Sequence, residues 1–556
     1  MKRILVFCVT WMFIATCFAQ ADQIKQNVED KILSNDQRPK LVVGIVVDQM
    51  RYDYLTRFYD KFGNGGFKRL VADGYNCKNN QFNYVPTYTA PGHTSIYTGT
   101  TPKYHGIIGN GWFDKETKKA VYCAEDNSVQ SVGTESAAGQ MSPRRLKSTT
   151  FADENKLFTQ MRGKTIGISL KDRAAILPVG FSADAAYWFH GALEGNWITS
   201  TYYMDDLPKW VKSFNKSDKA KSYLKIWDTR YDINTYIESG SDLNEFEGGF
   251  YGKATATFPY DLASLNERNG GFDILKSTPY GNNLTTDFAI AAIQGEDLGG
   301  DNITDILTIS YSSTDYIGHN FGVNSKEVED TYIRLDEDIE KLLRYLDQKV
   351  GINEYTLFLT SDHGAIHVPS YLQSVKIASG YIDAPAMNKT FLAFMNKKYG
   401  AVNLVENVSN NQIFLNHEKI ESLKLDLEDV QEAIVDELIK YEFIDKVYTA
   451  KSMVEGAFTE GIEALIQNGY NQKRSGDIIM VYDPAVISYA KTGSTHGSGQ
   501  NYDTHVPLLF YGKGIMKGST TEETKVVDIA PTISALLDIS FPNANTGKVI
   551  SKAIEK

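Results

Sequence analysis

Three aspartates and three histidines lie beside apolar runs that are typical of buried strands. They are Asp48, Asp315, His319, Asp362, His363 and His496. Carboxylate and imidazole ligands together suit Zn²⁺ and similar cations, whereas Mg²⁺ and Ca²⁺ prefer oxygen ligands alone. Six ligands divide into two sites of three, and two metal ions about 3.5–4 Å apart can bind the attacking and leaving oxygens of a displacement at phosphorus. Each motif alone is weak, but together they predict a binuclear metal site.

A nucleophile for such a displacement is present at Thr89, in the string YVPTYTAPGHTS. Residues 91–97 have a helical pattern that begins with proline, a residue favoured at the first position of a helix. We therefore expect Thr89 at a helix N-terminus, where free amides and the helix dipole attract anions such as a phosphoryl group. The alternative is that Thr89 only caps the helix, which is a common role for threonine.

Three further side chains could bind a phosphate group. Asn110 offers an amide donor on a glycine-flanked loop, GIIGNGW, while Lys171 and Arg173 follow the apolar run TIGISL in the string SLKDR. A guanidinium can bind two phosphate oxygens at once, and a nearby ammonium adds a point charge. Considered without the rest of the site, the lysine and the arginine would be interpreted as part of a solvated turn.

These residues require a sheet whose strand ends lie close together. Apolar runs predict buried parallel strands at residues 41–47, 165–170, 303–310, 355–359 and 506–511, and helical patterns cover residues 286–293, 326–346 and 527–537. This alternation predicts an α/β fold with a doubly wound, mostly parallel sheet sandwiched by helices. Asp48, Asp315 and Asp362 each follow a predicted strand, at the edge where ligands bind in such sheets, whereas His496 precedes one.

Two segments interrupt this pattern within a catalytic domain that we expect to span residues 38–556. Residues 190–285 are rich in Tyr, Trp, Asn, Ser and Gly and are interpreted as a loop-rich insertion. Residues 368–485 predict a small α+β subdomain. Its expected elements are strands at 390–395, 412–415 and 446–449 and a helix near 427–440.

The first residues of the chain predict export. Lys2 and Arg3 precede a short apolar run, and residues 1–19 are interpreted as a cleaved signal peptide, so the protein is expected to be periplasmic or secreted. The run is too short for a comfortable transmembrane helix, and no stable transmembrane segment is expected. Lipidation of Cys17 and an uncleaved anchor are the alternatives.

Charge and cysteine content add two expectations. The formal net charge of −12 disfavours nucleic acid as a specific partner. In an oxidising compartment, Cys77 and Cys123 are expected to form one disulfide, with two unpaired thiols as the alternative.

As a set, the motifs of this chain resemble those of the alkaline phosphatase superfamily. The similarity is greatest to the phosphate-irrepressible (PafA-type) periplasmic alkaline phosphatases of Bacteroidetes. The strings that carry it are VVDQMRYDYL, YVPTYTAPGHTSIYTG, GIIGNGW, SLKDRAA, STDYIGHNFG, TSDHG and STHGS. They extend from Asp48 to His496, and the resemblance covers nearly the whole mature chain.

The resemblance implies the hydrolysis of small-molecule phosphate monoesters through a phosphothreonine at Thr89, with two Zn²⁺ ions as cofactors. One zinc site would be Asp315, His319 and His496. The other would be Asp48, Asp362 and His363, with Thr89 bound to that metal. Mg²⁺ or Mn²⁺ at one site stays open. The resemblance also implies that Asn110, Lys171 and Arg173 bind the phosphate and favour monoesters over diesters.

A phosphodiesterase or nucleotide pyrophosphatase on the same core is the main alternative. Thr89 and the six metal ligands do not distinguish it, so the case against it rests on Asn110, Lys171 and Arg173. A sulfatase would need a cysteine or serine where Thr89 stands. A metal-stabilised binding protein without catalytic activity would not need the intact nucleophile.

Overall fold

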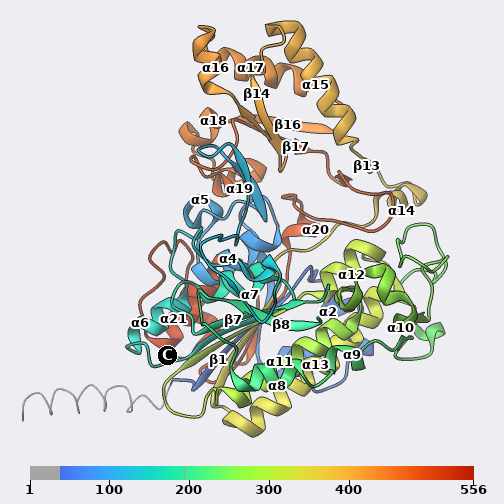
Figure 1. The fold of residues 1–556 in the computed structure, drawn as a ribbon, viewed down its shortest axis with the longest axis vertical. Coiled ribbons are helices and arrows are strands. Elements are labelled where there is room, and N and C mark those ends of the chain that lie inside the picture. Colours follow the sequence, from blue (N-terminus) through green and yellow to red (C-terminus); the bar gives the residue numbers. More distant parts are fainter. Residues whose placement is uncertain (1–37, 193, 556) are drawn as a thin grey trace, which may run out of the picture.

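A computed structural model describes residues 38–192 and 194–555 of the chain. Its centre is a sheet of ten strands in the order β20-β2-β19-β12-β1-β11-β6-β7-β8-β5, with helices on both faces (Figure 1). The edge strands are β20 (Gly518–Lys525) and β5 (Ser131–Val132). The predicted α/β sheet sandwiched by helices is thereby confirmed. The predicted signal peptide, residues 1–19, and Cys17 within it lie outside the described residues.

Five parallel strands form the middle of the sheet. They are β12 (Tyr355–Thr360), β1 (Leu41–Val47), β11 (Asp305–Tyr311), β6 (Thr165–Ser169) and β7 (Ala185–His190). Because helices cover both faces, nearly every side chain in these strands is buried, and each strand is mostly apolar, with a few small polar residues, instead of alternating between apolar and polar. The sequence predicts all of them except β7.

One predicted strand runs in the opposite direction to its neighbours. β19 (Leu508–Gly512) pairs antiparallel with β12 and with β2 (Tyr75–Gln81). The run at residues 506–511 predicts a strand here, but its assignment to a parallel arrangement is wrong. An apolar run indicates burial, whereas the direction of a strand depends on how the chain connects it to the sheet.

Two separate helix layers cover the sheet. The odd-numbered side chains of β1 pack with α11 (Pro279–Gly295) and α13 (Lys326–Leu346) on one face. Val42 and Val46 pack on the other face with α4 (Thr89–Thr98) and α21 (Ile529–Leu537). This division follows from the alternation of side chains along a strand. Among the helices of the described residues, none combines the length and the apolar character needed to cross a membrane.

Residues 190–285 contain short elements, of which one belongs to the main sheet. β8 (Asn196–Ser200) pairs antiparallel with β7. The remaining elements include α8 (Lys209–Asn215) and α10 (Leu262–Leu265), which lie on the same side of the molecule as α11 and α13 (Figure 1). Many of the buried aromatic residues of this segment therefore extend the apolar core of that face.

Residues 368–485 project from the sheet as a smaller unit, drawn in orange in Figure 1. Four of its strands, which include β14 (Val405–Ser409) and β17 (Ile478–Tyr482), form an antiparallel sheet in the order β14-β15-β17-β16. β15 (Gln412–Leu415), β16 (Ile444–Thr449) and α17 (Leu427–Leu438) lie close to the predicted positions.

The strand predicted at residues 390–395 is wrong, because these residues lie within helix α15 (Ala384–Tyr399). The carboxylate of Asp383 accepts a hydrogen bond from the amide of Ala386 and caps the helix. Phe391 and Met395, four residues apart, are both buried on the side of the helix that faces the small sheet. A short apolar run fits a strand or one face of a helix equally well, and tertiary packing decides between them.

The predicted disulfide is also wrong, because Cys77 and Cys123 are both buried free thiols. They belong to different apolar clusters, Cys77 to the one that contains α4 and α21, and Cys123 to a separate one around α7 (Asp172–Val179). Each packs as a small apolar side chain. Burial raises the pKa of both thiols to about 12.

Candidate metal centre and nucleophile

The carboxyl ends of the central strands carry most of the predicted metal ligands. Five of the six follow β1, β11 or β12, namely Asp48, Asp315, His319, Asp362 and His363. Asp315 and His319 lie four residues apart on α12 (Ser313–Phe321), so that both can face the same side of the helix. Because β1 pairs with β11 on one side and β12 on the other, all five residues lie at adjoining strand ends.

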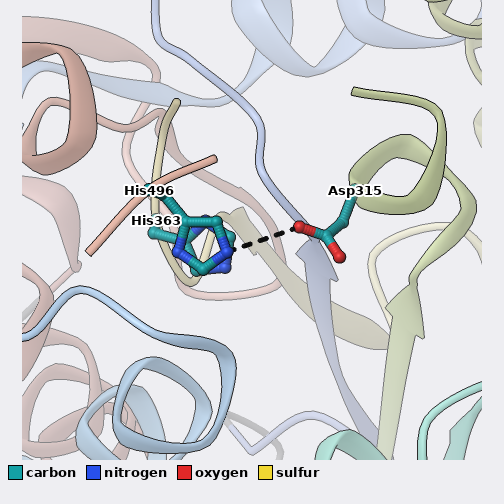
Figure 2. A group of neighbouring side chains, drawn as sticks. All are labelled: Asp315, His363 and His496. Atoms are coloured by element: carbon teal, nitrogen blue, oxygen red, sulfur yellow. Dashed lines mark ion pairs between the residues drawn. The ribbon is translucent and has the colours of Figure 1, made fainter. Parts of the chain in front are cut away.

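His496 reaches the same edge from the other direction. It precedes β19, whose first residue, Leu508, pairs with Thr360 at the end of β12. The start of this antiparallel strand therefore lies at the carboxyl edge of the parallel strands. The imidazole rings of His496 and His363 are stacked there, with their centroids 3.4 Å apart (Figure 2).

The six side chains form two overlapping groups. In each group, donor atoms of three residues all lie within 4.8 Å of one another. The first group is Asp48, Asp362 and His363, and the second is Asp315, His363 and His496, drawn in Figure 2. His319 joins the second group, since its Nε2 lies 3.2 Å from Oδ1 of Asp315, and Nε2 of His496 lies 3.7 Å from the same oxygen. The structure thus brings all six together and places His363 between the two groups.

Buried atoms without partners indicate where a cation would bind. Asp48 Oδ1, Asp362 Oδ2 and His363 Nε2 are buried and have no hydrogen-bond partner among the described residues. Nε2 of His363 lies 3.5 Å from each of the two oxygens. An unsatisfied buried polar atom costs about 1–3 kcal/mol, and one metal ion would satisfy all three atoms. The residues of the first group therefore fit a metal ion.

The histidines of both groups are oriented as metal-binding histidines are. In each, Nδ1 donates a hydrogen bond to a backbone carbonyl, at 2.8, 3.0 and 2.7 Å for His319, His363 and His496. This bond fixes the orientation of the ring and leaves the lone pair of Nε2 free to bind a metal ion. Nδ1 of His93 also lies 2.9 Å from a backbone carbonyl, that of Thr89, but its Nε2 differs, because it lies 2.9 Å from the hydroxyl of Ser310.

Lys171 lies between the carboxylates of Asp48 and Asp315. Its buried ammonium is 2.7 Å from Asp48 Oδ2 and 2.5 Å from Asp315 Oδ2. Burial, together with the charges of Asp315 and Asp362, raises the pKa of Asp48 well above its usual range. Burial opposes the ionisation of Asp315 as well, but His319 and Lys171 hold its pKa well below the usual range. Three carboxylates in one buried place require compensating positive charge.

Thr89 is the first residue of α4 and is buried, with Pro91 third in the helix and not first. The side-chain oxygen of Asn110 accepts a hydrogen bond of 2.9 Å from the amide of Ala90, so that the loop and the first turn of the helix are joined. Nη2 of Arg173 lies 3.5 Å from the hydroxyl oxygen of Thr89. Arg173, Asn110 and the free end of α4 thus converge on the nucleophile predicted from the sequence.

Gln49 is a residue of this site that the sequence analysis does not identify. Its Nε2 donates to Asp315 Oδ1 at 2.8 Å, and its backbone amide donates to Asp362 Oδ1 at 3.2 Å. Its φ of 64° is uncommon for a residue other than glycine and turns the chain away from β1. Its position next to Asp48 is the only sign of this role in the sequence.

Tyr122 is a second such residue. It ends β4 (Lys119–Tyr122), in a two-stranded hairpin outside the main sheet. Its hydroxyl donates to the carboxylate of Asp172 and accepts a hydrogen bond of 3.2 Å from Nη1 of Arg173. Nothing in the local sequence signals this contact, because the hairpin and the arginine meet only in the folded chain.

The chain is similar to known proteins over most of its length. A family model described as type I phosphodiesterase / nucleotide pyrophosphatase matches residues 42–506. A Myroides odoratus protein named calcium-transporting ATPase is 48% identical over 94% of this chain and 95% of its own length. Alkaline phosphatase PafA of Elizabethkingia meningoseptica is 47% identical over 93% of this chain and 95% of its own length.

The fold has a solved counterpart. A crystal structure of wild-type alkaline phosphatase PafA is similar with a TM-score of 0.90 and 46% identity, covering 93% of this chain and 99% of the other. A structure of a variant of PafA, in which one threonine, one asparagine, one lysine and one arginine are substituted together, gives the same TM-score.

Proposed function

The chain belongs to the type I phosphodiesterase / nucleotide pyrophosphatase family, and we infer from its similarity to PafA that it is an alkaline phosphatase, an enzyme that hydrolyses phosphate monoesters. The observation that carries this conclusion is the convergence of two metal-ligand groups at the sheet edge where α4 begins, since Nδ1 of His93 lies 2.9 Å from the carbonyl of Thr89 and 3.3 Å from Oδ2 of Asp362. Metal dependence follows from the same groups, because Asp48 Oδ1, Asp362 Oδ2 and His363 Nε2 are buried without a hydrogen-bond partner among the described residues.

We propose two Zn²⁺ ions as cofactors, with Mg²⁺ or Mn²⁺ at one of the two sites as the alternative. Asp48, Asp362 and His363 would hold one ion with Thr89, and Asp315, His319 and His496 would hold the other. When bound, such ions supply positive charge that makes a hydroxyl or water more acidic and stabilises negative oxygens. The mixed oxygen and nitrogen donors support zinc over cations that prefer oxygen donors alone.

The reaction we propose has two steps at Thr89. Its Oγ1 gives up its proton to solvent and forms a bond to phosphorus, while the bond from phosphorus to the alcohol oxygen breaks on the opposite side and the alcohol leaves with a proton from solvent. Water then attacks the phosphothreonine, releases inorganic phosphate and restores the hydroxyl. The N-terminus of α4 favours the negative phosphoryl group throughout. Positioning and charge stabilisation supply most of the acceleration in phosphoryl transfer.

Preference for monoesters is assigned to Asn110, Lys171 and Arg173. A monoester dianion carries more charge on its non-bridging oxygens than a diester, so cationic groups beside Thr89 favour the monoester. The four residue types substituted together in the PafA variant occur here in the same order as Thr89, Asn110, Lys171 and Arg173. A phosphodiesterase would share the metal ligands and Thr89, and the experiment below distinguishes the two activities.

We propose further that the protein is exported with the help of residues 1–19 and acts on small phosphate esters outside the cytoplasm. The charged and apolar pattern of these residues supports this proposal. Release of inorganic phosphate there would make it available for uptake.

The test compares an aryl phosphate monoester with the matching diester at mildly alkaline pH. We expect hydrolysis of the monoester to be lost after chelation and restored by zinc. In the variant Lys171→Ala/Arg173→Ala, kcat/KM for the monoester should decrease by about 10³-fold and for the diester by less than about tenfold. Lys397→Ala/Lys398→Ala, which removes two exposed charges from α15, is the matched control.

A strong preference of the wild-type enzyme for the diester would support the phosphodiesterase instead. Equal losses on both substrates in the double variant would contradict the role assigned to Lys171 and Arg173.

A further inference from the structure

A cavity of about 190 Å³ lies between the sheet core and the subdomain of residues 368–485. Its walls are mostly apolar or aromatic and include Tyr88, Ile366, Ile466, Ile479, Tyr482 and His496. An engineered protein cavity of about 150 Å³ with aliphatic walls binds benzene. The space between core and subdomain is therefore large enough for one aryl ring.

The cavity adjoins the candidate metal centre at His496. His496 belongs both to the cavity wall and to the metal-ligand group of Asp315. Tyr88 immediately precedes Thr89, and its ring meets the ring of His496 edge-on, with the centroids 5.7 Å apart. Two residues thus connect the cavity to the nucleophile and to the metal ligands.

The in-line geometry of the proposed reaction determines on which side of the site the leaving group departs. In an in-line displacement the alcohol oxygen leaves opposite the nucleophile, and the second ion of the proposed function, held by Asp315, His319 and His496, would bind that oxygen. Of this ligand group, His496 also lines the cavity, so the cavity is adjacent to the expected position of the organic group. Apolar and aromatic walls favour burial of an apolar or aryl group.

The charge of the cavity excludes a different class of leaving group. Asp483 and Asp503 line it, and none of the described residues in its wall is a lysine or an arginine. An anionic leaving group such as pyrophosphate would meet like charge and no cationic partner. The cavity therefore suits a neutral organic group.

We propose that this cavity binds the organic leaving group of the substrate, and that the enzyme prefers phosphate monoesters of aryl or similarly sized apolar alcohols. This proposal rests on the proposed function and adds a substrate class to it. The subdomain then contributes to catalysis by closing one wall of the leaving-group site.

The test uses a variant that fills the cavity from the subdomain side. Val481 on β17 (Ile478–Tyr482) lines the cavity and is only half-buried, so Val481→Phe adds volume without overpacking the subdomain core. Val447→Phe is the matched control, because Val447 lies on the adjoining strand β16, is also half-buried and does not line the cavity. Val481→Leu, which adds one methylene group, serves if the larger ring disturbs folding.

Two measurements are made on the metal-loaded enzyme. The first is kcat/KM for phenyl phosphate and for methyl phosphate, and the second is the dissociation constant of phenol, followed by ligand NMR. In Val481→Phe we expect kcat/KM for phenyl phosphate and the affinity for phenol each to decrease about tenfold, with less than a twofold change for methyl phosphate. Val447→Phe should resemble the wild type in all three.

Equal effects on both esters, or unchanged binding of phenol, would overturn the leaving-group assignment. If the wild-type enzyme hydrolyses neither ester, the proposed function itself fails. The two failures are therefore distinguishable.

Discussion

Several side chains of the candidate site are held by partners to which no step of the proposed reaction is assigned. Backbone carbonyls fix the rings of the three histidines, Gln49 donates to Asp315, and Tyr122 binds both Asp172 and Arg173. Such partners orient the groups that they contact, and their loss commonly weakens metal binding or activity tenfold or more. Arg173 is the informative case, because its Nε is buried and has no partner among the described residues.

A first prediction concerns Tyr122. Replacing it with phenylalanine removes the hydroxyl that Arg173 contacts, and a hydrogen bond to a charged group is worth about 1.5–3 kcal/mol. We expect kcat/KM for an aryl phosphate monoester to decrease about tenfold, and for the matching diester to decrease less than threefold. Tyr104→Phe, at an exposed tyrosine, is the control.

The effect should vanish in the background Arg173→Ala, because Tyr122 acts through that arginine. A loss of the same size with and without Arg173 would show that Tyr122 supports only the hairpin.

At the scale of elements, α13 joins the sheet to the segment of residues 190–285. Glu327 near its N-terminus is fully buried, and the hydroxyl of Tyr260 donates to it at 2.5 Å. Glu247 from the same segment is buried beside it. Burial raises the pKa of Glu327 to about 8 and, with the charge of Glu327 added, the pKa of Glu247 to about 9. The negative charge of nearby Asp242 also raises the pKa of both carboxyl groups.

These pKa values predict a loss of stability as the pH rises. Between the ordinary glutamate value near 4.5 and the folded-state values, the folded protein binds more protons than the unfolded chain, so the free energy of unfolding decreases with pH. One such proton contributes a slope of up to about 1.4 kcal/mol per pH unit. Glu327→Gln should flatten the decrease between pH 5 and pH 8, measured by urea unfolding.

Other buried acids contribute to the same trend, so the comparison between variants is the informative quantity. Glu337→Gln, at an exposed position of the same helix, should retain the wild-type slope. An unchanged slope in Glu327→Gln would mean that this carboxyl group does not titrate in the range.

At the scale of the whole molecule, the candidate metal centre connects segments that are far apart in the sequence. Candidate ligands at positions 48, 315, 319, 362, 363 and 496 meet at one sheet edge, and three of them are carboxylates in a buried place. Bound metal ions would therefore stabilise the arrangement of β1, β11, β12 and the segment before β19 together. The subdomain projects from the same region and closes the cavity beside His496.

Metal removal should accordingly destabilise the protein. Ligand binding stabilises a folded protein by about 4 kcal/mol when the free ligand is at a thousand times its Kd. We expect chelation to lower the apparent Tm by several degrees and zinc to restore it, as measured by calorimetry. Asp48→Asn should raise the Tm of the chelated protein, because it removes one buried like charge, and should weaken the response to zinc.

A Tm that does not change on chelation in the wild-type protein would contradict the metal assignment. It would also leave the unpartnered atoms of Asp48, Asp362 and His363 without an explanation.

Local patterns in the sequence determined much of the fold and the members of the site. Continuous apolar runs identify β1, β6, β11 and β12 because a parallel strand covered on both faces must be apolar throughout. The polar residues that follow such runs can be recognised as site residues because strand ends in these sheets form ligand sites. Asp48, Asp315 and Asp362 were identifiable for this reason, and Thr89 from the helix pattern after it.

Only the tertiary structure decided the features that depend on contacts between distant segments. The antiparallel direction of β19 brings His496 to the other ligands, and the packing of α15 makes residues 390–395 a helix. Separate apolar clusters keep Cys77 and Cys123 apart as free thiols, and the hairpin ending at Tyr122 reaches Arg173 across the site. Strand direction, thiol pairing and such hydrogen bonds are set by how the chain connects and packs over long distances, and a pattern of neighbouring residues carries no information about that.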